Sequence, residues 1–185
     1  MAGSDTPRRL DPVTVLAGTP NYPSGAAERG VQGTTVLEAE LTDGGSFTAP
    51  RVRESSGSPV LDEAASALLL RLRIAPGTAL PVPQPGTVLV PVAFRKDTLA
   101  SLQSKSCADF NRDAAYFTTA FPQRSLRDMP VFDVATAALV AAVPVARQVT
   151  LARELTDIQR GVIADCADKP QARFLELLLD RISGP

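Results

Sequence analysis

The chain has 185 residues, of which 44% are hydrophobic and 21% are charged, and its formal net charge is −1. This composition is typical of a globular protein, and the nearly neutral charge gives no electrostatic basis for binding nucleic acid or an anionic membrane. The sequence has no histidine and two cysteines, which excludes the usual zinc ligand sets and histidine-based catalytic triads. We therefore expect no metal, no cofactor and no enzyme activity.

The chain divides by composition near Lys96. Prolines, glycines and β-branched residues dominate before this point, and alanine and leucine with helical spacing dominate after it. No apolar run approaches the roughly 20 residues of a membrane-spanning helix, and the first residues lack the apolar core of a secretory signal. We expect an N-terminal leader segment over residues 1–18, an α+β domain over residues 19–96 and an all-helical domain over residues 97–185.

The α+β domain begins with a predicted strand and hairpin. In TTVLEAELTDGG, residues 34–45, apolar and polar side chains alternate, which predicts a strand with one solvated face. Asp43-Gly44-Gly45 can supply the positive backbone angles of a tight turn. Residues 46–55 are therefore expected to return antiparallel, with Pro50 weakening this strand or marking a bulge.

A helix and a third strand follow the hairpin. Ser58 can cap the helix, Pro59 suits its first position, and Pro76-Gly77 ends it. One apolar stripe is expected to pack on the hairpin, and it consists of Leu61, Ala65, Leu68 and Leu72. Residues 87–96, TVLVPVAFRK, then alternate again and predict a strand with one apolar face, formed by Val88, Val90, Val92 and Phe94.

Several short motifs now stand in a characteristic order and spacing: Asn21-Tyr22-Pro23, Ala27, Gly30, Gly33, Asp43-Gly44, Ser55-Ser56-Gly57, Leu61-Asp62, Ala64-Ala65, Pro76 and the closing Val-Pro-Val-Ala-Phe strand. Together they resemble the TonB C-terminal domain family over residues 19–96. The resemblance implies a periplasmic module that an inner-membrane anchor and a proline-rich arm hold in the full-length protein. It also implies a role in energy transduction, in which the last strand pairs with a short segment of an outer-membrane receptor.

The partner-binding residues follow from this resemblance. An exposed sheet edge offers unpaired N–H and C=O groups to an extended peptide, so the last strand is the candidate site. The expected binding residues are Thr87, Val88, Leu89, Val90, Val92 and Phe94, with Tyr22 and Pro23 beside them. Pro91 removes one donor from this strand. The alternative is that the strand is purely structural, and that Tyr22 packs on the helix.

Two features depart from the family pattern or suggest other chemistry. Leu72 and Ile74 stand where the family often has an aromatic pair late in the helix, and neither a membrane anchor nor a long proline-rich arm is present. The stretch Ser55-Ser56-Gly57 could suggest a nucleophile, but no histidine can activate a serine. We interpret this stretch as a turn.

The second domain has apolar stripes at helical spacing. The first helix is expected over residues 98–121 and the second, central helix over residues 131–143, and Pro144 separates it from the third. Pro170 is expected to open the fourth. The inward residues are Leu99, Leu102, Cys107, Phe110, Ala114, Phe117 and Phe121 in the first helix, Leu151, Leu155, Ile158, Val162 and Cys166 in the third, and Phe174, Leu175, Leu178 and Ile182 in the fourth. We expect a bundle of about four helices.

Both cysteines, Cys107 and Cys166, fall on inward stripes. This placement suits two buried thiols as well as a disulfide. The oxidising periplasm that the family resemblance implies favours the disulfide, and their wide separation argues against redox catalysis, which more often uses a C-x-x-C pair.

Two functional hypotheses follow. The first is a periplasmic TonB-like interaction module that binds an extended segment of an outer-membrane receptor at the last strand. The second is a structural envelope protein that uses the same fold for dimerisation or scaffolding without energy coupling. A homodimer through the last strand belongs to this second hypothesis, because sheet edges pair readily with a second copy.

Overall fold

The computed structural model describes residues 7–75, 77–78 and 85–182. The chain forms two compact units, which we call the sheet unit and the helical unit. The sheet unit consists of residues 1–27 and 32–95, and the helical unit consists of residues 28–31 and 96–185.

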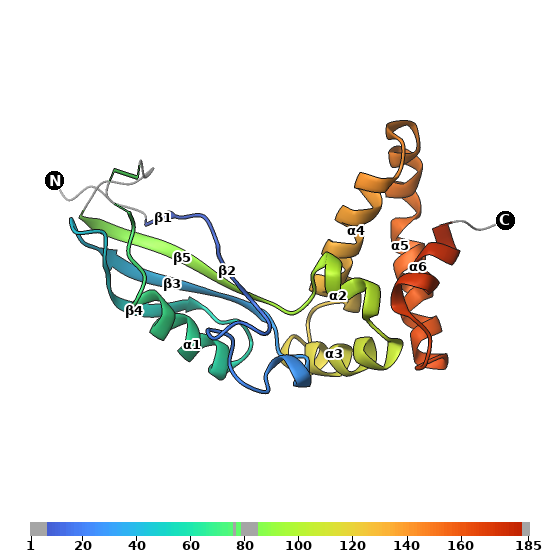
Figure 1. Ribbon diagram of the computed structural model, residues 1–185, viewed down its shortest axis with the longest axis horizontal. Coiled ribbons are helices and arrows are strands. Elements are labelled where there is room, and N and C mark those ends of the chain that lie inside the picture. Colours follow the sequence, from blue (N-terminus) through green and yellow to red (C-terminus); the bar gives the residue numbers. More distant parts are fainter. Residues whose placement is uncertain (1–6, 76, 79–84, 183–185) are drawn as a thin grey trace. The chain divides into compact units, whose positions relative to one another are not determined.

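The sheet unit is a β-sheet with one helix on its face (Figure 1). Its elements are β1 (Arg8–Arg9), β2 (Val13–Leu16), β3 (Gly33–Leu41), β4 (Phe47–Glu54), α1 (Pro59–Leu69) and β5 (Gly86–Arg95). A 3₁₀ turn, η1 (Ala27–Arg29), precedes β3, and its last two residues belong to the helical unit. In the sheet, β5 lies between β3 and the two short strands β1 and β2, and β4 lies beyond β3. The predicted order of strand, strand, helix and strand is confirmed by β3, β4, α1 and β5. The first two strands were not predicted.

The β3–β4 hairpin closes with a tight turn, as its glycines predicted. Thr42 donates its backbone N–H to the carbonyl oxygen of Ser46 at 2.9 Å, and Gly45 has a φ of 73°. A Cβ atom at Gly45 would lie 2.7 Å from the carbonyl oxygen of Ile74, so only glycine fits here. The predicted irregularity near Pro50 is also present, because the β3–β4 register shifts and Ala49 has a φ of 49°.

Helix α1 covers the sheet with three of the four residues of its predicted apolar stripe, and three details of the prediction are wrong. Leu61, Ala65 and Leu68 are buried, but Leu72 lies beyond the helix and is only partly buried. Ser58 makes no side-chain capping hydrogen bond. The helix also ends at Leu69, well before Pro76, which lies outside the described residues. It ends early because the following chain pairs with the hairpin, where the backbone N–H of Ile74 donates to the Gly45 carbonyl oxygen at 2.8 Å.

The helical unit contains α2 (Leu99–Ser104), α3 (Cys107–Ala120), α4 (Pro130–Ala142), α5 (Val145–Asp168) and α6 (Phe174–Ile182), with a 3₁₀ turn, η2 (Leu126–Asp128), before α4. The predicted first helix is thus divided at Lys105. Ser106 accepts a capping hydrogen bond from the Asp109 N–H while Asp109 bonds back to the Ser106 N–H, which starts a new helix. Burial opposes ionisation of Asp109, but the hydrogen bonds from Ser106 and Arg112 outweigh it and lower the pKa of Asp109 to about 2.

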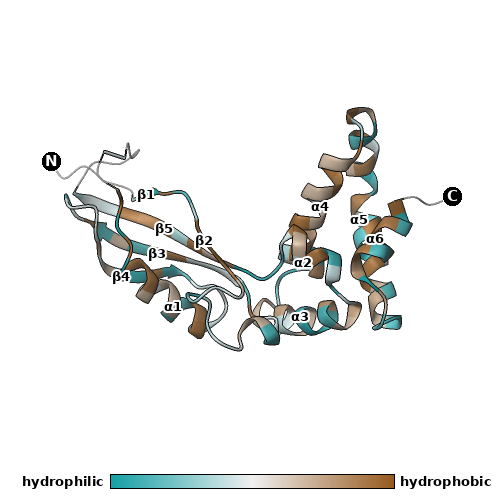
Figure 2. Cartoon of the chain, in the orientation of Figure 1, coloured by the Kyte–Doolittle hydropathy of each residue, from teal (hydrophilic) through white to brown (hydrophobic). Residues whose placement is uncertain are grey.

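Three further helical predictions need correction. Leu99 is 61% exposed, because it lies in the first turn of the short α2, whose Leu102 is the residue that enters the core. The last helix begins at Phe174, because the carbonyl oxygens of Pro170 and Ala172 accept backbone hydrogen bonds from the first two residues of α3. The end of α4 is apolar but exposed, with Val140 at 41% (Figure 2), so this helix is central only as far as Leu139, which is 5% exposed and packs in the helical core.

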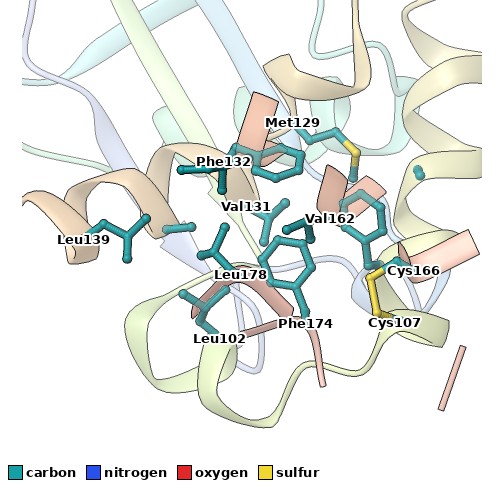
Figure 3. Packing of buried hydrophobic residues seen from close by; sticks show 14 of the residues in the cluster. Leu102, Cys107, Met129, Val131, Phe132, Leu139, Val162, Cys166, Phe174 and Leu178 are labelled. Atoms are coloured by element: carbon teal, nitrogen blue, oxygen red, sulfur yellow. A yellow bond between two sulfur atoms is a disulfide. The ribbon is translucent and has the colours of Figure 1, made fainter. Parts of the chain in front are cut away.

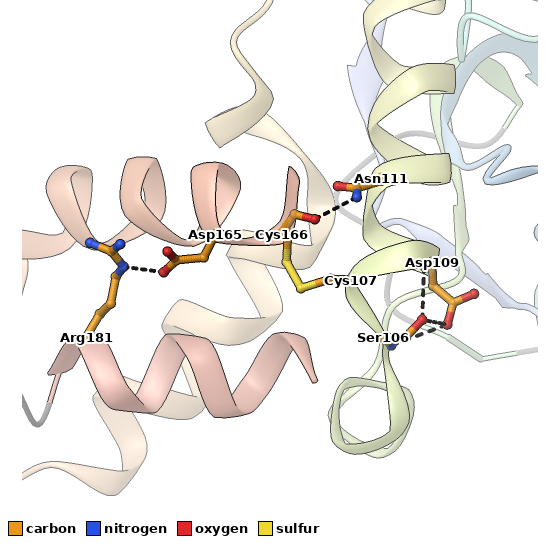
Figure 4. Close-up of a disulfide and its surroundings, with 7 residues drawn as sticks. All are labelled: Ser106, Cys107, Asp109, Asn111, Asp165, Cys166 and Arg181. Carbon is orange, nitrogen blue, oxygen red and sulfur yellow. Dashed lines mark hydrogen bonds and ion pairs between the residues drawn. A yellow bond between two sulfur atoms is a disulfide. The ribbon is translucent and has the colours of Figure 1, made fainter. Parts of the chain in front are cut away.

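Three phenylalanines from different helices form the centre of the helical core (Figure 3). The ring of Phe110 stacks on that of Phe174 at 5.2 Å and meets the edge of Phe132 at 5.8 Å. The Cys107–Cys166 disulfide joins the start of α3 to the end of α5, with the two Cα atoms 4.8 Å apart (Figure 4). Asn111 supports the same contact by donating a hydrogen bond to the Cys166 carbonyl oxygen at 2.8 Å.

The helical unit also buries a charge network of two lysines and two aspartates: Lys96, Asp97, Lys105 and Asp113. The Lys105 ammonium lies 2.7 Å from Asp97 Oδ1 and 2.6 Å from Asp113 Oδ2, and its side chain is 4% exposed. Burial disfavours the charged ammonium, but attraction to the two carboxylates outweighs this effect and raises the pKa of Lys105. The network places opposite charges in mutual contact, so we interpret it as structural.

Replacing both cysteines, as Cys107→Ser with Cys166→Ser, is expected to lower the free energy of unfolding of the helical unit by up to roughly 4 kcal/mol. The reason is that the closed loop of 59 residues no longer restricts the unfolded chain. Urea unfolding followed by far-UV circular dichroism measures the change. The wild-type protein in reductant serves as the control and should unfold like the double variant. Equal unfolding midpoints for the oxidised wild type and the variant would contradict a structural role for the disulfide.

Replacing Lys105 with Met is expected to destabilise the helical unit by about 3–5 kcal/mol, because two buried carboxylates lose their shared cation. In the wild type, the stabilisation from Lys105 is complete below pH 10.5, the ordinary pKa of lysine, and is lost as the pH rises through the higher pKa of the folded state. Chemical unfolding across this alkaline range tests both statements. The matched control is Lys169→Met, which removes an exposed lysine, and an equal loss of stability in the two variants would refute the expectation.

Candidate partner-binding edge

Strand β5 contains the residues that the sequence analysis proposed for partner binding, and it is paired on both sides. On one side it runs antiparallel to β3 along the whole of β3, from Gly33 opposite Phe94 to Leu41 opposite Gly86. On the other side it runs parallel to β1 and β2, with Arg8 opposite Val88 and Leu16 opposite Arg95. We call this second side the β5 edge, and residues 8–16 the cover segment.

The backbone groups that face the β5 edge can be assigned from two hydrogen bonds. Leu10 donates its N–H to the Leu89 carbonyl oxygen at 2.8 Å, and Ala17 donates to that of Arg95 at 2.9 Å. Successive residues of a strand present their backbone groups to opposite neighbours, so odd-numbered β5 residues face the cover segment and even-numbered ones face β3. Pro91 is therefore on the β5 edge, and its missing N–H removes a donor from this side.

The side chains predicted to bind a partner divide into two groups. Val88, Val90, Val92 and Phe94 are each at most 2% exposed and belong to the core of the sheet unit. Thr87 and Leu89 are partly exposed, and the Thr87 hydroxyl donates a hydrogen bond to Glu40 Oε1 at 2.9 Å. The groups that β5 offers to a partner at its edge are therefore mainly those of the backbone.

Tyr22 and Pro23 lie beside α1 in the sheet unit. The Tyr22 side chain is 7% exposed, and its ring meets the Phe94 ring edge-on at 5.6 Å. The segment around Tyr22 and Pro23 borders an open pocket of about 430 Å³ against α1. Arg71 donates a hydrogen bond to Asn21 Oδ1 at 3.1 Å beside this pocket. The contact with Phe94 links Tyr22 to the end of β5.

The opposite edge of the sheet, formed by β4, is poorly suited to strand addition. Its register against β3 shifts twice, and Ala49-Pro50 interrupts it. Most of its side chains are exposed, including Arg51, Arg53 and Glu54. Bulges, proline and charged side chains are the features by which natural sheets prevent unwanted pairing at an edge. The β5 edge is thus the better candidate of the two.

The Ser55–Gly57 stretch forms a turn held by Asp62. The Asp62 carboxylate accepts hydrogen bonds from the Ser55 hydroxyl at 2.6 Å, from the Ser56 hydroxyl and N–H, and from the Thr35 hydroxyl at 2.7 Å. Burial raises the pKa of Asp62, but these donors together lower it below its usual value. A carboxylate with a lowered pKa is a weak base, so this arrangement suits a structural turn rather than an activated nucleophile.

Among the residues that the structure describes, no group of three or more histidine, cysteine or acidic side chains could hold a metal ion. None of the helices in this part of the chain is both long enough and apolar enough to cross a membrane.

The feature that sequence reasoning missed is the cover segment. A short alternation was present in Val13-Thr14-Val15-Leu16, but Pro12 precedes it and no turn signal connects it to a neighbouring strand. Its partner is a parallel strand more than 70 residues later in the chain, and such pairing leaves no local pattern.

Comparison with known proteins supports the family resemblance. The family model described as Gram-negative bacterial TonB protein C-terminal matches residues 18–95. No curated protein and no solved structure matches the chain. The match covers the hairpin, α1 and β5 and ends where the helical unit begins. Residues 18–95 of this chain are therefore similar to the TonB C-terminal family, whose domains are in general periplasmic and non-enzymatic protein-interaction domains.

Proposed function

We propose that this protein is a periplasmic TonB-like interaction module that takes part in energy transduction by binding an extended segment of an outer-membrane receptor at the β5 edge. Residues 19–96 form the interaction domain in this proposal, and residues 97–185 form a helical domain with its own disulfide. An inner-membrane anchor in the full-length protein would connect the module to its energy source.

The observation that carries this proposal is the contrast between the two edges of a sheet that matches the TonB family. The β4 edge is bulged and charged, whereas β5 has a regular backbone against β3 and is covered only by short strands. Strand addition needs a regular row of N–H and C=O groups, and its affinity comes mainly from main-chain hydrogen bonds. The backbone groups of the β5 edge, which pair with the cover segment here, are the contacts we assign to the receptor segment, more than the buried β5 side chains.

The direct test is an NMR titration of the ¹⁵N-labelled full chain with short peptides from the N-terminal segments of outer-membrane receptors. Saturable shifts are expected in the amides of Thr87 to Phe94, because these residues lie next to the added strand. A matched peptide with proline at two adjacent central positions, one of which has to present its N–H to β5, is expected to bind at least about tenfold more weakly, because proline lacks the donor N–H.

The matched protein control is Val52→Lys, which places a charge on the β4 edge at a side chain that is 45% exposed. If the receptor segment binds the β5 edge, this variant retains the wild-type affinity. Loss of binding in Val52→Lys would move the site to β4, and absence of saturable shifts for every receptor peptide would contradict the proposed function.

The second candidate function is that of a structural envelope protein that dimerises or scaffolds through this sheet. The pairing of β5 on both sides within one chain is the observation that favours it. Sedimentation of the same sample separates the candidates. A dimer that does not respond to receptor peptides supports the structural role, whereas a monomer that binds them supports the receptor role.

A further inference from the structure

We propose that the cover segment, residues 8–16, is a built-in competitor that occupies the β5 edge until a partner segment replaces it in the same parallel direction. This inference rests on the proposed function, because it concerns the regulation of the same edge. It assigns to the N-terminal strands a role other than structural support. It also defines the partner segment by direction and side-chain pattern.

The direction follows from the observed pairing. Both β1 and β2 run parallel to β5, and Leu10 and Ala17 donate their N–H groups to β5 carbonyl oxygens. These are the backbone groups of the β5 edge that strand addition would use. A partner that adds to this edge must therefore displace the cover segment, and the exchange leaves the β3–β5 pairing intact.

The cover segment is weakly held compared with the rest of the sheet. Its two strands span two and four residues, and the register shifts by one residue between Arg9 and Val13, where Pro12 lacks an N–H. In β1 and β2, the side chain of Val15 is buried, whereas those of Thr14 and Leu16 are exposed. The Arg9–Glu54 ion pair joins two exposed side chains at 3.5 Å and adds little. Few buried apolar contacts and solvent-exposed backbone pairing are the marks of a segment that opens locally.

The cover segment also lies outside the part of the chain that defines the family. The family match begins at residue 18, just after β2 ends at Leu16. The domain and its occupant are therefore separate stretches of sequence, joined by a short connection that keeps the local concentration of the occupant high. A covalently attached competitor of this kind lowers the apparent affinity for a free segment without changing the site itself.

The side chains of the cover segment indicate which kind of partner segment the β5 edge accepts. The partner is an extended segment that runs parallel to β5. At the position of Val15, opposite Phe94, it carries an apolar and preferably β-branched side chain, because this position is buried. At the positions of Thr14 and Leu16 the edge accepts a wide range of side chains, because these positions are exposed.

Two proline variants of the full chain separate the competitor role from a general disturbance of the strand. By the alternation of backbone groups, the Val15 N–H faces β5 and the Thr14 N–H faces away from it. Val15→Pro removes a bond to β5 together with the buried side chain, whereas Thr14→Pro inserts the same residue without losing a donor to β5. Only the first variant should release the cover segment.

The probe is a synthetic peptide with the sequence of residues 7–17, PRRLDPVTVLA. In an NMR titration, Val15→Pro is expected to bind this peptide at least about tenfold more tightly than the wild type, with shifts in the Ala93 and Arg95 amides. Thr14→Pro is expected to bind like the wild type. Equal affinities for Val15→Pro and wild type would overturn the proposal, as would peptide binding without shifts in β5.

The same samples distinguish failure of this inference from failure of the proposed function. If Val15→Pro takes up the residue 7–17 peptide but no receptor peptide, the exchange stands and the receptor role fails. If receptor peptides bind the wild type and Val15→Pro with equal affinity, the receptor role stands and the competitor role fails.

Hydrogen exchange in the wild-type protein tests the inference without any substitution, so the result does not depend on whether a variant folds. The amides of Ala93 and Arg95 face the cover segment, whereas those of Val92 and Phe94 face β3. We expect the first pair to exchange at least about tenfold faster than the second, because opening of the cover segment exposes only one side of β5. Equal protection of the two pairs would show that the cover segment opens only with the whole sheet, and would refute its role as a displaceable competitor.

Discussion

The pairing of β5 with β3 along the whole of β3 is the contact on which the sheet unit depends. It joins the last strand to a hairpin formed much earlier in the chain and creates the continuous apolar face that α1 covers. The even-numbered residues of β5 are used twice in this arrangement, because their side chains enter the core and their backbone groups bond to β3. Only the odd-numbered backbone groups remain for any other strand. Every functional proposal for this protein therefore concerns one row of N–H and C=O groups.

The parts of the sheet unit that could be predicted from the sequence are those with local signals. These signals concern residues close in sequence or a single buried face. They are the alternation in residues 34–45 and 87–96, Gly45 in the turn and the apolar stripe of α1. The cover segment gives no comparable signal, because a short parallel strand has neither a hairpin turn nor a long alternation. The binding site at β5 stays a prediction, and the pairing of the cover segment with this strand was not predicted.

In the helical unit, apolar spacing predicted the helices but not their interruptions. At the break between α2 and α3, Lys105 is buried in a network with Asp97 and Asp113, whose members come together only in the folded unit. From the sequence alone, a lysine between two short helical stretches is expected to be exposed to solvent, since lysine is rarely buried without a paired charge. The Cys107–Cys166 pairing could be inferred, because both cysteines lie on inward stripes and a periplasmic family favours oxidation.

A covered edge resolves a conflict between binding and solubility. A regular strand edge that accepts a receptor segment also accepts a second copy of the same chain, and long uncovered edges favour aggregation. A short parallel cover opposes both reactions, but it opposes them through backbone bonds that any incoming strand can replace. The exchange of one strand for another conserves most of these bonds, so it gains little from the backbone itself. Selectivity must then come from the buried position of Val15 and from tethering of the partner, which are the two features that a specific receptor segment can supply and a chance encounter between two copies cannot.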